Sequence, residues 1–268
     1  MSKPVNPIGS DPYLISVALD RGSVLSFEDY PFCIPAVRNL YELEFHPKVT
    51  YFVGDNGTGK STLLEAIAVA AGFNPEGGSR NFNFTTRGSH SDLYEHIRLK
   101  RGMSRGKDGF FLRAESFFNL ATEIEKIDSD PDNVNNNSGP PIQRSYGGNS
   151  LHEQSHGESF MTLLTERFRG NGLYLLDEPE AALSPSRQMS VLTVMHDLIR
   201  RNSQFVIVTH SPILMAYPDS TIYLFSDDAI TPIDYTDTEH FTITRDFLNR
   251  REAMLRVLLG EEESCSGG

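Results

Sequence analysis

Residues 49–72, "VTYFVGDNGTGKSTLLEAIAVAAG", place a glycine-rich turn between a run of apolar residues and a helical pattern. The turn "GDNGTGKS" fits the spacing G-x-x-x-x-G-K-[ST], in which glycines let backbone N–H groups face inward around phosphates. In the segment that follows, apolar residues recur on one helical face, and Gly72 stands where a C-cap glycine belongs. A strand, a glycine turn and a helix in immediate succession predict a phosphate-binding P-loop.

Each part of this loop has an expected task in binding a nucleotide. Lys60 is expected to reach the β- and γ-phosphates, and Ser61 to ligate Mg²⁺. The helix that starts here adds its positive end. The residues predicted to surround the nucleotide are Gly54, Asp55, Asn56, Gly57, Thr58, Gly59, Lys60, Ser61 and Thr62.

The rest of the chain alternates buried strands with helices. Strands are expected at residues 14–20, 40–45, 48–54, 172–178, 204–211 and 221–225. A helix is expected at 184–202, with Ser184 as its N-cap and Pro185 at its first position, and a last amphipathic helix at about 244–260. This pattern predicts an α/β fold with a mostly parallel central sheet flanked by helices, N-terminal antiparallel strands and a small helical lobe.

One domain is expected over residues 1–268. Its core would comprise residues 1–115 and 165–268, and a short helical lobe would occupy 116–164. Within the lobe, residues 127–150 are rich in Asp, Asn, Pro, Gly and Ser, which is the composition of a mobile loop.

Composition excludes several classes of protein. The net charge of −12 and the pI near 5.1 disfavour nucleic acid and anionic lipid as general partners, so any contact with DNA needs a local basic patch. The two cysteines, Cys33 and Cys265, lie far apart, which excludes a disulfide framework and suits a reducing compartment. The sequence has no apolar run of membrane-spanning length, so we expect a cytoplasmic protein without an integral membrane segment.

Polar residues stand at the ends of two predicted strands, where a P-loop site requires them. "LYLLDE" ends in Asp177 and Glu178, and "VIVTHS" leads to His210. We expect Asp177 to hold Mg²⁺, Glu178 to act as general base on water, and His210 to sense the γ-phosphate. The predicted catalytic residues are therefore Lys60, Glu178 and His210. The alternative for the acidic pair is a simple cap on the following helix.

The segment "SLHEQSHGESF", residues 150–160, contains Ser155 and Glu158 at the spacing of a capping box. Apolar residues at helical spacing follow it. By itself this pattern predicts only the start of a helix.

Four motifs in this order, "GDNGTGKST", "SHGE", "LLDEPEAAL" and "VTHS", resemble the Walker A, signature, Walker B with D-loop, and switch-histidine motifs of ABC-type ATPases. The chain is most similar to small soluble bacterial ATPases related to the chromosome-maintenance and DNA-repair (SMC/RecF-like) branch. The resemblance spans about residues 40–225. It implies ATP hydrolysis with Mg²⁺ in a head-to-tail homodimer. In that dimer Ser155, Gly157 and Glu158 of one chain would contact the ATP bound by the other, so the helix cap and the signature would be one element.

The sequence departs from that family at several positions. The glutamine usual at the junction between core and lobe is missing, and Glu115 or Ser116 stands in its place, with Glu115 the candidate metal ligand. Ser184 replaces the D-loop aspartate. The segment between Walker A and signature shows no sustained heptads, so no coiled coil is expected. Tyr30 or Phe32 could stack on adenine, or could simply pack in the core.

Three functions remain open at this point. The first is a regulatory or mechanical ATPase that acts on nucleic acid or on a partner protein. The others are the ATP-binding subunit of a transporter, which the missing glutamine disfavours, and a nucleotide kinase, which would have no use for the signature. A basic segment could be a phosphate-binding surface or a solvated loop. Its residues are Arg87, Arg98, Lys100, Arg101, Arg105, Lys107 and Arg113.

Overall fold

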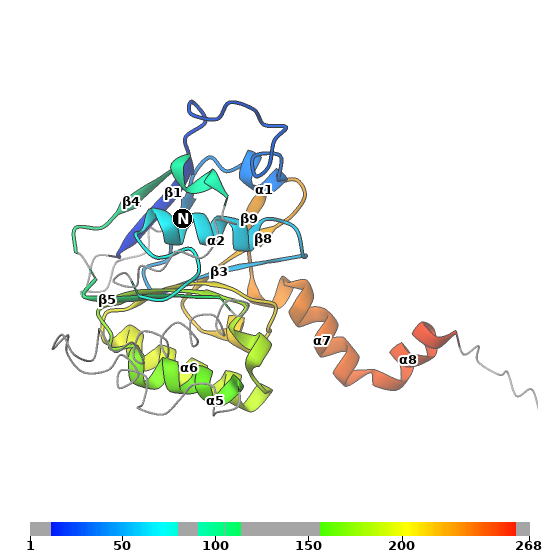
Figure 1. Ribbon diagram of the computed structural model, residues 1–268. Coiled ribbons are helices and arrows are strands. Elements are labelled where there is room, and N and C mark those ends of the chain that lie inside the picture. The colour runs from blue at the N-terminus through cyan, green and yellow to red at the C-terminus, as the bar shows by residue number, and fades with distance from the viewer. Residues whose placement is uncertain (1–11, 80–90, 105, 114–155, 261–268) are drawn as a thin grey trace, which may run out of the picture.

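A computed structural model (Figure 1) describes residues 12–79, 91–104, 106–113 and 156–260. It contains a six-stranded sheet in the order β5-β6-β7-β3-β8-β9 and a three-stranded sheet in the order β2-β1-β4. The central sheet consists of β3 (Val49–Gly54), β5 (Asp108–Arg113), β6 (Gly172–Asp177), β7 (Gln204–Val208), β8 (Thr221–Phe225) and β9 (Ile230–Ile233). All its pairings are parallel except that of β8 with β9, which confirms the predicted mostly parallel sheet.

The small sheet is antiparallel, as predicted for the N-terminal strands. It joins β1 (Leu14–Leu19) to β2 (Leu43–Glu44) on one side and to β4 (Ile97–Arg101) on the other. The strand expected at residues 40–45 is therefore reduced to the two residues of β2.

Helices cover both faces of the central sheet (Figure 1). On one face lies α2 (Lys60–Ala70), between the two sheets and close to α1 (Pro35–Arg38). On the other lie α5 (His156–Thr162) and α6 (Pro185–Arg200). Each face has its own apolar cluster, and all residues of β3, β6 and β7 are buried. Burial on both faces explains why these strands are continuous apolar runs rather than alternating ones.

The sequence pattern did not predict strands β4 and β5, because their residues belong to the basic segment. In β4, "IRLKR" alternates apolar and basic side chains, which suits a strand with one buried face. In β5, "DGFFLR" is a short buried run that pairs in parallel with β6. The alternative of a solvated loop for this basic segment is therefore wrong where these two strands lie.

The C-terminal segment forms two helices, α7 (Glu239–Asn249) and α8 (Arg251–Leu259), instead of the single helix predicted at about 244–260. The chain leaves helical geometry at Arg250, with φ −129° and ψ 35°. Neither helix contains a buried residue, and both project away from the sheets (Figure 1). Apolar residues recur at helical spacing on both sides of the break, so the sequence pattern predicted a single helix. Within the described residues, no helix combines the length and the apolar character that crossing a membrane requires.

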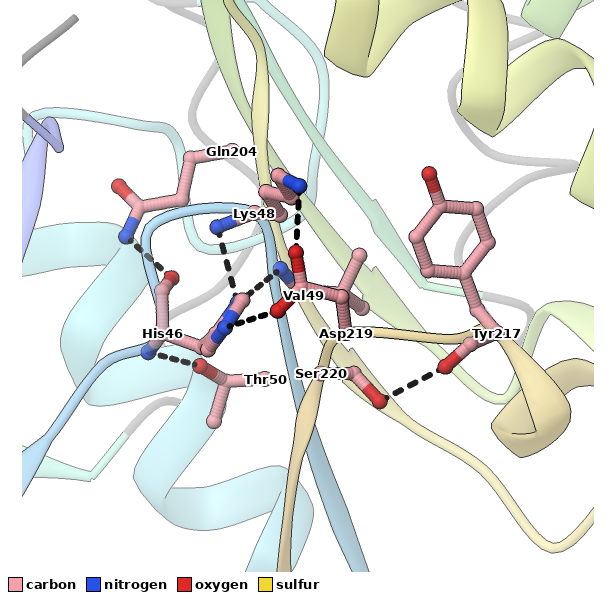
Figure 2. A network of polar contacts seen from close by, with 8 residues as sticks. All are labelled: His46, Lys48, Val49, Thr50, Gln204, Tyr217, Asp219 and Ser220. Atoms are coloured by element: carbon pink, nitrogen blue, oxygen red, sulfur yellow. Dashed lines mark hydrogen bonds and ion pairs between the residues drawn. The ribbon is translucent and has the colours of Figure 1, made fainter. Parts of the chain in front are cut away.

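A polar network fixes the starts of β3 and β8, at the edge opposite the P-loop (Figure 2). The His46 Nδ1 atom accepts hydrogen bonds from the backbone N–H groups of Lys48 and Val49, over 3.2 and 3.4 Å. Asp219 lies 3.4 Å from His46 Nε2 and 2.5 Å from Lys48 Nζ. The Gln204 amide donates to the His46 carbonyl, which adds β7 to the network.

Candidate nucleotide-binding site

The P-loop joins the end of β3 to the start of α2, as the sequence predicted. Gly54, Gly57 and Gly59 have φ angles of 136°, 85° and 93°, in the region that favours glycine. A Cβ atom on Gly54 would lie 2.2 Å from the Phe225 carbonyl oxygen, and one on Gly59 would lie 2.7 Å from Ile34 Cγ2. Both the backbone conformation and the surrounding space therefore favour glycine at positions 54 and 59, whereas at Gly57 only the backbone conformation does.

Lys60, the first residue of α2, is buried and its side chain crosses the loop. Its ammonium group donates hydrogen bonds to the carbonyl oxygens of Gly54 at 2.8 Å and Asp55 at 2.6 Å. Burial lowers the pKa of Lys60, and the nearby carboxylates of Glu178, Asp55 and Asp177 oppose that effect. A desolvated cation beside inward-facing backbone groups fits the β- and γ-phosphates of a nucleotide.

Ser61 and Asp177 meet beside Lys60. The Ser61 hydroxyl donates a hydrogen bond of 2.8 Å to Asp177 Oδ1, and the Asp177 side chain is only 10% exposed. A hydroxyl and a carboxylate oxygen are hard ligands that suit Mg²⁺, which commonly takes one or two protein oxygens together with phosphates and water. Their contact makes Ser61 and Asp177 the candidate metal site. No cluster of three or more His, Cys, Asp or Glu side chains occurs in the described part of the chain.

Glu178 follows Asp177 in a left-handed conformation, with φ 50° and ψ 52°. This geometry is uncommon for a residue with a side chain and costs about 1–2 kcal/mol. The Glu178 N–H donates to the Val208 carbonyl over 3.0 Å, which ties the turn to β7. The side chain is 43% exposed, and its Oε1 atom lies 3.6 Å from His210 Nε2. The two residues predicted as general base and phosphate sensor are therefore neighbours.

Two residues that the sequence analysis did not assign hold His210 in place. The Glu180 carboxylate accepts a hydrogen bond of 2.5 Å from the His210 backbone N–H. Burial raises the pKa of Glu180, although that hydrogen bond acts in the opposite direction. The imidazole of His240, in α7, lies 2.8 Å from His210, between Nε2 of His240 and Nδ1 of His210. Glu180 lies within the motif "LLDEPEAAL", two residues after Glu178, whereas nothing in the sequence pattern around His240 marks it.

The signature helix α5 packs against the segment that follows Walker B. A Cβ atom on Gly157 would lie 2.3 Å from Arg187 Nη1 and 2.8 Å from the Ala182 carbonyl oxygen. Glu158 Oε1 lies 3.5 Å from Arg187 Nη2. Ser155 lies outside the described residues, so its predicted capping of this helix stays a prediction.

Arg113 lies beside the candidate metal pair, two positions before Glu115. Arg113 ends β5 and pairs in register with Asp177 on β6. Its Nη1 atom lies 2.5 Å from Glu65 Oε2, and its Nε atom lies 3.8 Å from Asp177 Oδ2. Glu115 and Ser116 lie outside the described residues, and the assignment of Glu115 as a metal ligand stays a prediction. Arg113 was counted only as part of the basic segment.

Other residues of the basic segment are also engaged within the chain. Arg98 forms an ion pair of 2.6 Å with Asp20, and Arg101 donates to the Ala70 carbonyl. Arg87 and Arg105 lie outside the described residues. These internal contacts weaken the idea of a phosphate-binding surface.

The two aromatic candidates for adenine stacking differ in exposure. Phe32 is buried and packs edge to face on His96, with ring centroids 4.9 Å apart, so its packing role accounts for it. Tyr30 is 65% exposed.

Two family models match the chain. One, an "AAA domain", matches residues 32–162, and the other, "AAA domain, putative AbiEii toxin, Type IV TA system", matches residues 144–216. No curated protein sequence matches the chain.

Similar solved structures include an SmcHead bound to the C-winged helix domain of ScpA, with 14% identity, coverage of 83% of this chain and 98% of that chain, and a TM-score of 0.47. The SMC head domain from Thermotoga maritima has 14% identity, coverage of 83% and 99%, and a TM-score of 0.44. MJ1267, an ATP-binding cassette of an ABC transporter, has 16% identity, coverage of 91% and 98%, and a TM-score of 0.48.

The glycine loop between a buried parallel strand and a helix, with a carboxylate at the end of a neighbouring strand, defines a P-loop protein. The fold is that of P-loop ATPases, and the two AAA-domain models match the region that carries the four motifs.

Proposed function

We propose that the chain binds ATP together with Mg²⁺ and hydrolyses it to ADP and phosphate. The observation that carries this proposal is the contact of Ser61 with Asp177 beside the buried Lys60. Glu178 and His210 stand at the same edge of the sheet, so groups for binding phosphate, holding a metal and activating water lie together.

In this proposal the loop N–H groups and Lys60 hold the phosphates. Ser61 and Asp177 would hold Mg²⁺, which when bound neutralises negative charge on the phosphate oxygens. Glu178 accepts a proton from the attacking water, since its carboxylate is partly exposed at the strand end. His210 directs Nε2 toward Glu178, and in this proposal it senses the γ-phosphate.

We further propose that hydrolysis takes place in a head-to-tail homodimer. The support is the motif "SHGE", of which Gly157 and Glu158 lie in the first turn of α5. A helix start in this position offers N–H groups and a positive dipole end to a phosphate held by another chain. Ser155 would complete that contact. The roles of Ser155, Gly157 and Glu158 rest on the resemblance to ABC-type ATPases.

We propose that this ATPase has a regulatory or mechanical role and acts on nucleic acid or on a partner protein. We propose a cytoplasmic location for it. Arg98, paired with Asp20, and Arg101, bound to the Ala70 carbonyl, are already engaged within the chain, which gives less support to nucleic acid as the partner. The domain division into a core at 1–115 and 165–268 and a lobe at 116–164 remains part of this proposal.

The test is a turnover assay with purified protein, ATP and Mg²⁺. Wild type should release ADP and phosphate in equal amounts, Lys60→Ala should lose nucleotide binding, and Glu178→Gln should bind ATP without cleaving it. Lys48→Ala, which changes a lysine at the opposite edge, is the matched control and should keep activity. A wild-type protein that binds ATP but releases no phosphate, or that transfers phosphate to a nucleotide acceptor, would overturn the proposal.

A further inference from the structure

His240 brings α7 into the proposed active site. It is the second residue of that helix, and its Nε2 atom lies 2.8 Å from Nδ1 of His210. The two imidazole rings have centroids 4.9 Å apart and are tilted by 55°. A distance of 2.8 Å between two ring nitrogens requires that one donates a hydrogen bond and the other accepts it.

We infer that His240 is a positioning residue, which holds His210 in the tautomer that carries its proton on Nε2 and faces Glu178. This inference rests on the proposed function of His210 at the ATP site. It assigns the direction of one hydrogen bond, from Nε2–H of His240 to the lone pair on Nδ1 of His210.

The surroundings of Nε2, the other ring nitrogen of His210, indicate the direction of the hydrogen bond between His240 and His210. His210 Nε2 is buried, has no hydrogen-bond partner among the described residues, and lies 3.6 Å from Glu178 Oε1. If the His210 proton were on Nδ1, the lone pair of Nε2 would face a carboxylate, and the two would repel. With the proton on Nε2, the N–H dipole points toward that carboxylate, which is the favourable arrangement.

The charges around the pair are consistent with two neutral rings at pH 7. Burial, then the Lys60 ammonium, then His240 lower the pKa of His210, while Glu178 and Asp55 act in the opposite direction. Burial also lowers the pKa of His240, against the effect of Glu239. A neutral His210 has one lone pair available, and His240 uses it.

The consequence for the reaction is a fixed donor beside the general base. A histidine whose second nitrogen is bound by a neighbour keeps both its ring orientation and its proton location, and at metal-ligating histidines the loss of such a neighbour costs about ten- to a hundred-fold in metal affinity or activity. We therefore expect His240 to affect kcat through His210 while ATP binding stays unchanged.

The experiment is NMR of protein labelled with ¹⁵N in its histidine rings, recorded at pH 7.5 without nucleotide. The His210 signals are assigned from their loss in His210→Gln. Wild type should show His210 protonated on Nε2, and His240→Phe, which keeps a ring but removes the donor, should show a smaller share of this tautomer, since only Glu178 then favours it. His240→Gln places an amide N–H at a similar reach and should restore the wild-type pattern.

Turnover is measured on the same variants. His240→Phe should lower kcat about tenfold with KM for ATP unchanged, and His240→Gln should recover most of the loss. His196→Phe, which removes a histidine that contacts Tyr217 instead, is the matched control and should change neither measurement.

The outcomes separate this inference from the proposed function. A wild-type His210 protonated on Nδ1, or a tautomer that is unchanged in His240→Phe, would overturn the inference whatever the turnover shows. The expected tautomers in a protein that never hydrolyses ATP would support the positioning role and refute the ATPase.

Discussion

The Ser61 hydroxyl and the Asp177 carboxylate are joined by a hydrogen bond of 2.8 Å across 116 positions of sequence. Ser61 comes from the first turn of α2, and Asp177 from the end of β6. The parallel sheet brings these two points together, because β6 lies beside β7 and β7 beside β3, which leads into the P-loop. The sheet order thus converts two distant motifs into one candidate metal site.

This contact predicts that Ser61 and Asp177 act on the same ligand. Asp177→Asn should raise the concentration of free Mg²⁺ that half-saturates ATP turnover by at least about tenfold, because a charged metal ligand becomes neutral. Ser61→Ala should act in the same direction. The double variant should be little worse than Asp177→Asn alone, since residues that share a partner are not additive.

The control for the metal prediction is Ser190→Ala, which removes a hydroxyl that donates to the Ser186 carbonyl within α6. It should leave the Mg²⁺ dependence unchanged. An Asp177→Asn protein with the wild-type Mg²⁺ dependence would show that the metal is held elsewhere.

Gly54 supplies a prediction about the loop itself. Gly54→Ala places a methyl group 2.2 Å from the Phe225 carbonyl, so the loop and β8 must move apart, and nucleotide binding should be lost. Gly72→Ala is the matched control: Gly72 also has a positive φ, of 92°, but no atom lies within 4 Å of its added Cβ. It should cost about 1–2 kcal/mol of unfolding free energy and leave ATP affinity intact. Isothermal titration with ATP and urea unfolding measure the two effects.

Asp108 predicts how stability depends on pH. Its carboxylate accepts hydrogen bonds from Arg167 at 2.7 Å, the Arg169 N–H at 2.9 Å and the Tyr174 hydroxyl at 2.7 Å. Burial acts to raise the pKa of Asp108, but these three contacts outweigh it and lower the pKa below its ordinary value. The carboxylate therefore stabilises the fold fully above the unfolded pKa, near 3.9, and this contribution is lost as pH falls through the lower folded pKa.

Asp108→Asn should lower the free energy of unfolding by about 3 kcal/mol at pH 7, because it leaves the largely buried Arg167 without its counter-charge. The difference from wild type should shrink in acid, where Asp108 itself becomes protonated. Asp246→Asn, in an exposed pair with Arg245, is the control and should leave stability unchanged. Equal stability of Asp108→Asn and wild type in urea at pH 7 would contradict this account.

The sequence predicted the parts of the site that local patterns encode. The P-loop, and the polar residues Asp177, Glu178 and His210 at strand ends, follow from strand and helix patterns together with the rule that parallel strands end at one edge. The position of Arg113 beside Asp177 could not be predicted in this way, since β5, which ends at Arg113, lies within a basic segment of the sequence. His240 lies in a separate helix, and only the three-dimensional packing of α7 brings it to His210.

The break between α7 and α8 shows a second limit of pattern reading. Hydrophobic spacing reports which residues share a helical face, but it does not report a single residue that leaves helical geometry. Arg250 is such a residue, and neither helix has a buried face whose packing would mark the break.

The central claim is that two chains close around ATP, and sedimentation of Glu178→Gln tests it most directly. This variant should bind ATP with Mg²⁺ and keep it uncleaved, so that the phosphate held by Lys60 in one chain meets the α5 start of the other. The account predicts a monomer without ATP and a dimer with saturating ATP, and Ser155→Arg in the same chain should abolish the dimer while ATP stays bound. A Glu178→Gln protein that binds ATP yet remains monomeric at tens of micromolar protein would contradict the account.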